Sequence, residues 1–186
     1  MAIIHEDGAY GHGVADGNKQ GSKKHGFKIV LKEGYAATSP DLSYLITKLK
    51  RRRPDIIFHT GYNPDISLFL RQSRERGLKW KALVGHGAGY GVLDKLYEAV
   101  DDDANYIFNV DPASIWLIDP EALAPGLGEI TEMVGEEYKK ARPNTRTFSA
   151  HGGMVASNVF IFFDDVLPRA IKKHGGISSE ALRKAA

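Results

Sequence analysis

Residues 7–13 read DGAYGHG and follow a short apolar run, AII, at residues 2–4. A polar stretch of helical character comes next, so the segment is a glycine-rich turn from a strand to a helix. In an open α/β sheet such turns lie at the carboxyl ends of the strands, where ligands bind and where small residues let a ligand approach the backbone closely. Tyr10, in the middle of the turn, is therefore a candidate for ligand recognition.

The turn does not match a nucleotide-binding motif. It is neither G-x-G-x-x-G nor a Walker A loop, and no Lys-Ser or Lys-Thr pair follows its glycines. We therefore expect no nucleotide here, and the rest of the sequence indicates no other cofactor.

Strands and helices alternate through the first 110 residues. β-rich runs lie at residues 2–4, 28–31, 56–59, 82–84 and 106–110, and helical stretches lie at residues 14–25, 42–53, 66–76 and 93–100. In the second helical stretch the apolar residues recur with the period of one helix face: Leu42, Leu45, Ile46 and Leu49. Pro54 ends this stretch, and Gly77 is placed to end the next one. The alternation predicts an α/β fold, a Rossmann-like doubly wound parallel sheet with right-handed crossovers.

The pattern changes after Val110. A helix is expected near residues 127–140, a long apolar segment covers residues 154–171, and a further short helix begins near residue 178. We therefore expect two parts, a Rossmann-like ligand-binding lobe at residues 1–110 and a helical segment at residues 111–186.

The amino-acid composition argues against several classes of protein function. Lys and Arg total 25 against 23 Asp and Glu, and the resulting net charge of +2 gives no indication of binding to nucleic acid or to an anionic membrane. The absence of Cys excludes disulfides, zinc-cysteine sites and thiol catalysis. No apolar run reaches the roughly 18 residues that a transmembrane helix needs, and we expect no signal peptide in this chain because its N-terminus lacks the basic and apolar regions of one.

Four segments follow predicted strands: residues 5–7, 59–62 and 86–91, and Asp111. Because the carboxyl ends of parallel strands share one edge of the sheet, we expect these segments to line one mouth. His5, His59 and His86 suggest a metal or an acid–base site. Their spacing does not fix their mutual distances, and imidazoles also serve as ordinary hydrogen-bonding groups, so we predict no metal.

Aromatic side chains are the other candidates at this mouth. Tyr10 and Tyr62 are able to stack on the apolar part of a ligand and to offer it a hydroxyl group, whereas we expect Tyr90 to close the core. Residues 85–91 are rich in glycine, but no basic residue follows them closely. We therefore expect a flexible loop that faces the ligand rather than a phosphate site.

Several short motifs occur together along the chain. They are the Asp-x-x-Tyr-Gly-x-Gly turn at residues 7–13, SPD at 39–41, PDIIF at 54–58, GYNPD at 61–65 and RQSRERGL at 71–78. In this order and spacing they resemble the periplasmic substrate-binding proteins of branched-chain amino-acid (Leu/Ile/Val-binding) ABC transporters. The resemblance covers most of the chain.

That family has a type I periplasmic-binding fold, in which two Rossmann-like lobes trap the ligand by hinge closure. The resemblance implies that residues 1–110 form most of the second lobe and that residues 111–186 form helices that pack on the first lobe. We expect the first lobe, and the final strands beyond Ala186, to be absent from this chain.

The resemblance also implies site residues. Tyr10 and Tyr62 match two ligand-contacting tyrosines of the family, but the glutamate that binds the ligand ammonium falls at Gly87. Without that carboxylate nothing at this position pairs with an α-ammonium group, although Asp7 is a possible substitute. The expected ligand-binding residues are Tyr10, Tyr62, His86, Gly87 and Asp7. The expected ligand is an amino acid, an amide, or an aromatic or aliphatic carboxylate.

The implied function is the solute-binding component of an ABC-type transporter, not an enzyme, with an ABC permease as partner and the periplasm as the place of the full-length parent. Two alternatives stay open: a small α/β enzyme with a histidine-lined site at the strand carboxyl ends, and the effector domain of a regulator. Phe160, Phe162 and Phe163 need an apolar partner surface, so we also predict a homodimer of this chain.

Overall fold

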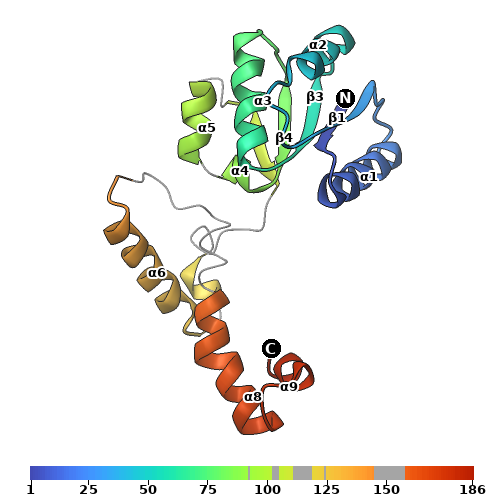
Figure 1. Ribbon diagram of the computed structural model, residues 1–186. Helices are drawn as coiled ribbons and strands as arrows, with labels where there is room; N and C mark the ends of the chain where they lie inside the picture. The colour runs from blue at the N-terminus through green and yellow to red at the C-terminus, as the bar shows by residue number, and fades with distance from the viewer. Residues whose placement is uncertain (92, 102–104, 111–118, 124, 145–157) are drawn as a thin grey trace. The chain divides into compact units, whose positions relative to one another are not determined.

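The computed structural model describes residues 1–91, 93–101, 105–110, 119–123, 125–144 and 158–186. The chain forms two compact units, Met1–Asp111 and Pro112–Ala186 (Figure 1). The roles that the sequence suggests for these two parts stay predictions.

The first unit alternates strands with helices. In chain order its elements are β1 (Ala2–Glu6), α1 (Ala9–Lys24), β2 (Leu31–Tyr35), α2 (Ser43–Arg52), β3 (Ile56–Thr60), α3 (Asn63–Glu75), β4 (Ala82–His86), α4 (Ala88–Gly91), α5 (Leu93–Val100) and β5 (Ile107–Val110).

All strand pairs of this sheet are parallel, and their order is β2-β1-β3-β4-β5. Helix α1 covers one face of the sheet, while α2, α3 and α5 lie on the other (Figure 1). The predicted doubly wound α/β sheet is confirmed. The chain winds outward from β1 to β2 and then back past β1 to β3, so the winding reverses between β1 and β3, which is where open sheets of this kind form their ligand crevice.

The core lies mainly between the sheet and the α2, α3 and α5 layer. The apolar face predicted for the second helical stretch is completely buried, at Leu42 directly before α2 and at Leu45, Ile46 and Leu49 within it. Helix α2 ends at Arg52, with Arg53 between it and Pro54, and Gly77 follows the end of α3 with a positive φ of 61°, as the sequence predicts.

Several predicted boundaries were wrong. The second strand begins at Leu31 rather than at residue 28, and α1 and α3 begin five and three residues earlier than expected, at Ala9 and Asn63. Both helices begin early because a buried carboxylate accepts hydrogen bonds from backbone N–H groups at the start of the helix. The glycine-rich segment at residues 85–91 is not a flexible loop, because it completes β4 and then forms the helical turn α4.

The second unit is helical where it is described. Its elements are a 3-10 turn at Pro120–Ala122, α6 (Leu127–Ala141), a π-helical turn at Phe162–Val166, α8 (Leu167–His174) and α9 (Ser179–Ala185). A small apolar cluster joins the π-helical turn, α8 and α9, and it consists of Val166, Ala170, Ala181 and Ala185. Residues 154–157 of the predicted apolar helix lie outside the described residues.

Candidate ligand-binding site

Three of the predicted site residues meet at the carboxyl edge of the sheet. Tyr10 lies in the first turn of α1, Tyr62 lies directly before α3, and His86 is the last residue of β4. The ring centroids of Tyr10 and Tyr62 are 5.8 Å apart, and those of Tyr10 and His86 are 5.7 Å apart. A hydrogen bond of 2.6 Å joins Tyr10 Oη to His86 Nδ1. These three side chains, which we call the ring cluster, lie beside the point where the winding of the sheet reverses.

Glu6 shapes the turn that carries Tyr10. The carboxylate of this buried residue accepts hydrogen bonds from the backbone N–H of Gly8 and, at 2.5 Å, from that of Gly11. It therefore satisfies donors that the first turn of α1 would leave without a partner, and its negative charge lies at the positive end of the helix dipole. The start of α1 at Ala9, and with it the position of Tyr10, follows from this capping.

Asp65 fixes the turn that carries Tyr62 in a similar way. Its Oδ1 accepts the backbone N–H of Tyr62 at 2.8 Å, and its Oδ2 accepts the hydroxyl of Tyr35 at 2.5 Å. Asp65 is itself buried, and burial raises the pKa of its carboxyl group, while the hydrogen bond from Tyr35 acts in the opposite direction. The backbone at Tyr62 is thus tied to the buried end of β2.

His59 extends this network into the core. Its Nε2 lies 2.7 Å from Tyr35 Oη, and its Nδ1 is hydrogen-bonded to the hydroxyl of Tyr90. Because the Tyr35 hydroxyl donates to Asp65, it accepts from His59 Nε2–H, which leaves Nδ1 to accept from Tyr90. Complete burial lowers the pKa of His59 to about 3, and the nearby His5 acts in the same direction, so the ring is neutral at pH 7.

Gly87 lies where the loops after β3 and β4 touch. The backbone N–H of Gly61 donates to the carbonyl of His86 at 3.3 Å, and Gly87 has a φ of 127°. A Cβ atom added at Gly87 would lie 2.3 Å from the carbonyl oxygen of Gly61. The position that carries a glutamate in the resembled family is therefore closed to any side chain on this backbone.

The structure places the other predicted mouth residues differently. Asp7 is exposed after β1, and the described residues show no contact between its carboxylate and the ring cluster. The prediction that His5 and His59 line the mouth was wrong, because both belong to buried strands and are at most 3% exposed. Tyr90 closes the core as predicted, and Asp111 lies outside the described residues.

The ring cluster offers flat ring faces, two phenol hydroxyls and one imidazole. Such groups stack on the planar or apolar part of a small molecule and hydrogen-bond to its polar end. Within the part of the chain that the structure describes, no group of three His, Asp or Glu side chains is arranged to hold a metal ion. Of the helices described, none is long and apolar enough to cross a membrane.

Sequence reasoning missed the residues that hold the ring cluster in place. Tyr35 belongs to no motif, and Asp65 stands out only as the last residue of GYNPD. A signal for Asp65 was present, because an acidic residue three positions after Tyr62, with Pro64 between them, is typical of a helix start. No local pattern indicates the pairing of Tyr35 with His59, which are 24 residues apart.

Comparison with known proteins adds the family context. The family profile described as periplasmic binding protein matches residues 1–186. Leu/Ile/Val-binding protein homolog 8 from Brucella abortus (strain 2308) is 33% identical over 138 residues, which are 74% of this chain and 34% of that protein. Homolog 7 from Brucella suis biovar 1 (strain 1330) is 29% identical over 186 residues, 100% of this chain and 43% of that protein. The chain thus spans less than half the length of these curated relatives.

Solved structures share the fold. A leucine-binding protein from Thermotoga maritima MSB8 matches with a TM-score of 0.70 at 17% identity, covering 99% of this chain and 48% of that chain. A periplasmic binding protein type 1 from Bordetella pertussis Tohama I matches with a TM-score of 0.72 at 18% identity, again covering 99% and 48%. At such identities the likeness concerns the fold, which is that of type I periplasmic binding proteins.

Proposed function

This chain belongs to the periplasmic binding protein family, and on that premise we propose that it is part of the solute-binding component of an ABC-type transporter. The observation that carries the proposal is the convergence of Tyr10, Tyr62 and His86 at the reversal point of the sheet. In the proposed solute-binding component, the ring cluster forms one side of a cleft between two lobes. The ligand contacts Tyr10, Tyr62 and His86 and the backbone at Gly87, and Asp7 stands at the rim.

The ligand is an amino acid, an amide, or an aromatic or aliphatic carboxylate. Gly87 supports a departure from branched-chain amino acids, since the closed space at this residue leaves no room for a carboxylate that would pair with an α-ammonium group. The aromatic side chains favour ligands with a planar or apolar body. The full-length parent works in the periplasm and delivers its ligand to an ABC permease.

The histidine-lined enzyme is the weaker alternative. His59 is fully buried between two tyrosine hydroxyls and His5 is almost fully buried in β1, so neither is placed to transfer protons to a substrate at the mouth. Only His86 of the three lies at the ring cluster.

Ligand binding by this chain alone is expected to be weak. A protein pocket buries about 70–90% of a ligand, and a two-lobe clamp divides those contacts between its lobes. If the whole protein binds at about 1 μM, half of the binding free energy corresponds to a dissociation constant of about 1 mM. Isothermal titration calorimetry with amino acids and aromatic acids should therefore detect weak binding or none. Submicromolar binding by the monomeric chain would refute the division of the site between two lobes.

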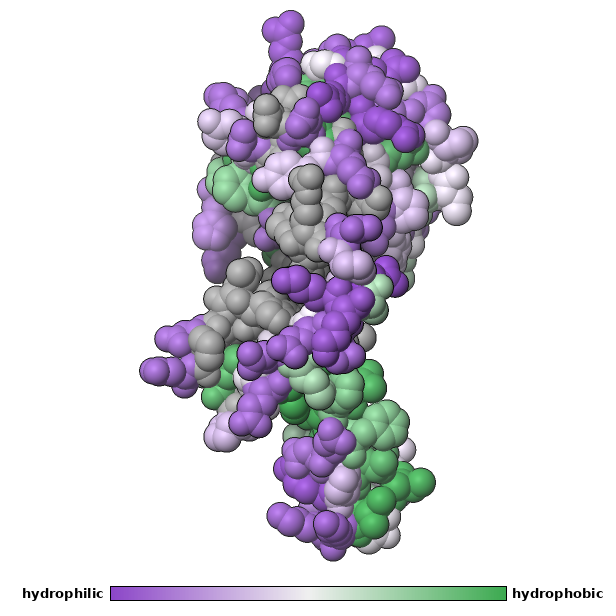
Figure 2. Space-filling model, turned by 90° about the vertical axis from the view of Figure 1, so that its left-hand side faces the viewer, coloured by the Kyte–Doolittle hydropathy of each residue, from purple (hydrophilic) through white to green (hydrophobic). Residues whose placement is uncertain are grey.

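We further propose that the chain forms a homodimer through its C-terminal unit. Apolar side chains of residues 159–177 are exposed, among them Phe160, Phe163, Ile171 and Ile177. Figure 2 shows green, apolar side chains gathered over α8 and α9 beside purple, hydrophilic ones. Exposed apolar patches of this kind mark interaction surfaces, and a second copy of the chain supplies an equivalent surface.

The homodimer makes a direct prediction for solution mass. Light scattering at micromolar concentration should report twice the 20.5 kDa of the chain, with a buried interface above about 2,000 Å² if the dimer is obligate. A Phe160→Asp/Phe163→Asp double variant should be monomeric, whereas Tyr97→Asp, at a ring of the first unit about as exposed as that of Phe163, should leave the dimer intact. A monomer that does not bind an apolar dye would contradict the proposal, because the helices would then cover their own apolar surface.

A further inference from the structure

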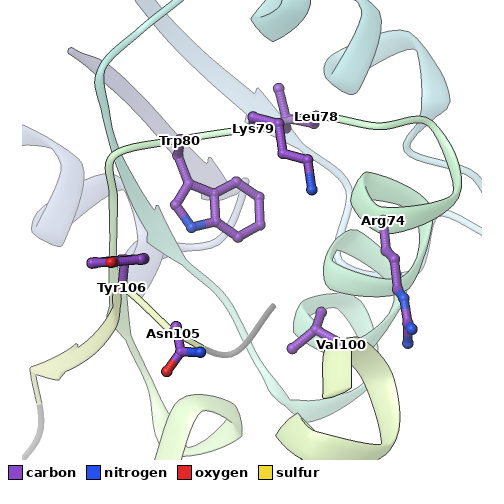
Figure 3. Close-up of a pocket in the computed structure, with 7 residues that line it drawn as sticks. All are labelled: Arg74, Leu78, Lys79, Trp80, Val100, Asn105 and Tyr106. Carbon is purple, nitrogen blue, oxygen red and sulfur yellow. The ribbon is translucent and has the colours of Figure 1, made fainter. Parts of the chain in front are cut away.

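A cavity of about 290 Å³ lies at the amino ends of β4 and β5, and Figure 3 shows the side chains that line it. Its lining residues come from the segments that lead into β4 and β5 and from the ends of α3 and α5, and they are Arg74, Leu78, Lys79, Trp80, Val100, Asn105 and Tyr106. The ring cluster follows the carboxyl ends of the strands, whereas this cavity lies at their amino ends. The length of β4, about 16 Å for its 5 residues, separates the two.

Two aromatic rings and two aliphatic side chains form the walls of the cavity. Leu78 and Val100 are buried, and Trp80 is partly buried against the core. Figure 3 shows these side chains around the hollow. Tyr106 has a positive φ of 67°, a conformation that bulky residues rarely adopt, and its carbonyl accepts the backbone N–H of Leu83 at 2.9 Å. The backbone that carries the phenol is therefore held in place at the rim of the cavity.

Two basic residues also line this cavity. Arg74 lies on one side of it, and the ammonium end of Lys79 points toward the hollow (Figure 3). Arg74 is paired with Asp101, whose Oδ2 is 3.7 Å from Nη2, which is too long for a hydrogen bond. The Arg74 side chain is about half exposed and that of Asp101 is largely exposed, so the pair is a weak one that a ligand carboxylate is able to displace.

We propose that this amino-edge cavity is a second ligand site, and that it takes a small aryl carboxylate. The volume is near the lower end for ligand pockets and suits a single ring. The indole of Trp80 and the phenol of Tyr106 provide surfaces for that ring. The planar guanidinium of Arg74 matches the geometry of a carboxylate. This site does not depend on the transporter role proposed for the ring cluster.

The test of this site is a titration of the full 186-residue chain with benzoate. Titration with benzoate should shift the indole N–H resonance of Trp80 in a saturable way in the millimolar range. The other indole signal belongs to Trp116 and is assigned with Trp116→Phe. Benzyl alcohol, which keeps the ring but lacks the charge, should bind about tenfold more weakly than benzoate, because it cannot pair with the guanidinium.

Three variants test where benzoate binds. Arg74→Gln should raise the dissociation constant for benzoate about tenfold. Arg71→Gln, on the same helix and also ion-paired but outside the cavity, should not change it. Tyr62→Leu should leave the Trp80 shift intact, which separates this site from the ring cluster. The proposal is wrong if Trp80 shows no saturable shift, if Tyr62→Leu abolishes the shift, or if benzyl alcohol binds as well as benzoate.

Discussion

Replacing Gly87 with alanine should lower the free energy of unfolding by about 2–5 kcal/mol. A side chain in this left-handed region costs about 1–2 kcal/mol, and forcing an extra carbon into a packed contact adds about 1–3 kcal/mol. The contact is with the backbone carbonyl of Gly61, 2.3 Å from the added Cβ, so no side-chain rotation relieves it. Urea denaturation followed by tryptophan fluorescence measures the loss.

Gly77 provides the matched control for Gly87. It also has a positive φ, but a Cβ added there meets nothing within 4 Å. Gly77→Ala should therefore show only the conformational cost of about 1–2 kcal/mol. Equal losses for the two variants would show that the loops after β3 and β4 separate easily, contrary to the close contact of Gly87 with Gly61.

The same contact governs any attempt to restore the glutamate of the resembled family. Gly87→Glu should be at least as destabilising as Gly87→Ala and should not increase the affinity for leucine. The missing carboxylate is thus a property of the backbone at this loop, not only of one side chain. A stable Gly87→Glu variant that gains affinity for leucine would contradict this explanation.

Much of the first unit could be predicted from short-range patterns. The apolar face of α2 repeats with the helical period and is entirely buried, because periodicity reports directly on which side of a helix faces the core. The alternation of strands and helices indicated the parallel sheet, since right-handed crossovers leave few other topologies. Tyr10 and Tyr62 were brought together correctly because the carboxyl ends of parallel strands share one edge.

The wrong predictions for His59 and for the starts of two helices have one physical cause, which is polar contacts that local sequence patterns do not indicate. His59 was expected at the mouth, but the hydroxyls of Tyr35 and Tyr90 satisfy both of its ring nitrogens and allow it to be buried. The starts of α1 and α3 were missed because buried carboxylates, those of Glu6 and Asp65, extend the helices beyond their apolar pattern. A hydrogen bond between residues that are far apart in the sequence produces no periodic pattern from which it could be predicted.

Acid should destabilise the first unit through His59. Burial lowers the pKa of this imidazole from 6.5 in the unfolded chain to about 3 in the folded protein. Between these pH values the unfolded state binds more protons than the folded state, so the free energy of unfolding falls as the pH is lowered. The slope is about 1.4 kcal/mol per pH unit below the unfolded pKa, which amounts to about 2 kcal/mol between pH 8 and pH 5.

Urea denaturation at pH 8, 6.5 and 5 measures this effect, and His59→Gln isolates it. Glutamine keeps a donor and an acceptor between Tyr35 and Tyr90 but does not titrate, so the variant should be less stable at pH 8 and should lose the fall in stability between pH 8 and pH 5 that His59 causes. His25→Gln, at an exposed histidine after α1, should keep the slope of the wild type. Above pH 5 the exposed carboxyl groups of Asp16, Asp41 and Asp55, whose pKa values are lowered, stay ionised and do not contribute. The buried Asp65, whose pKa is raised, acts against the His59 slope because the folded protein takes up its proton at higher pH than the unfolded chain, and it does so in the wild type and in His59→Gln. A wild-type slope that persists in His59→Gln would mean that His59 takes up a proton in the folded state, which the closed network around it does not allow.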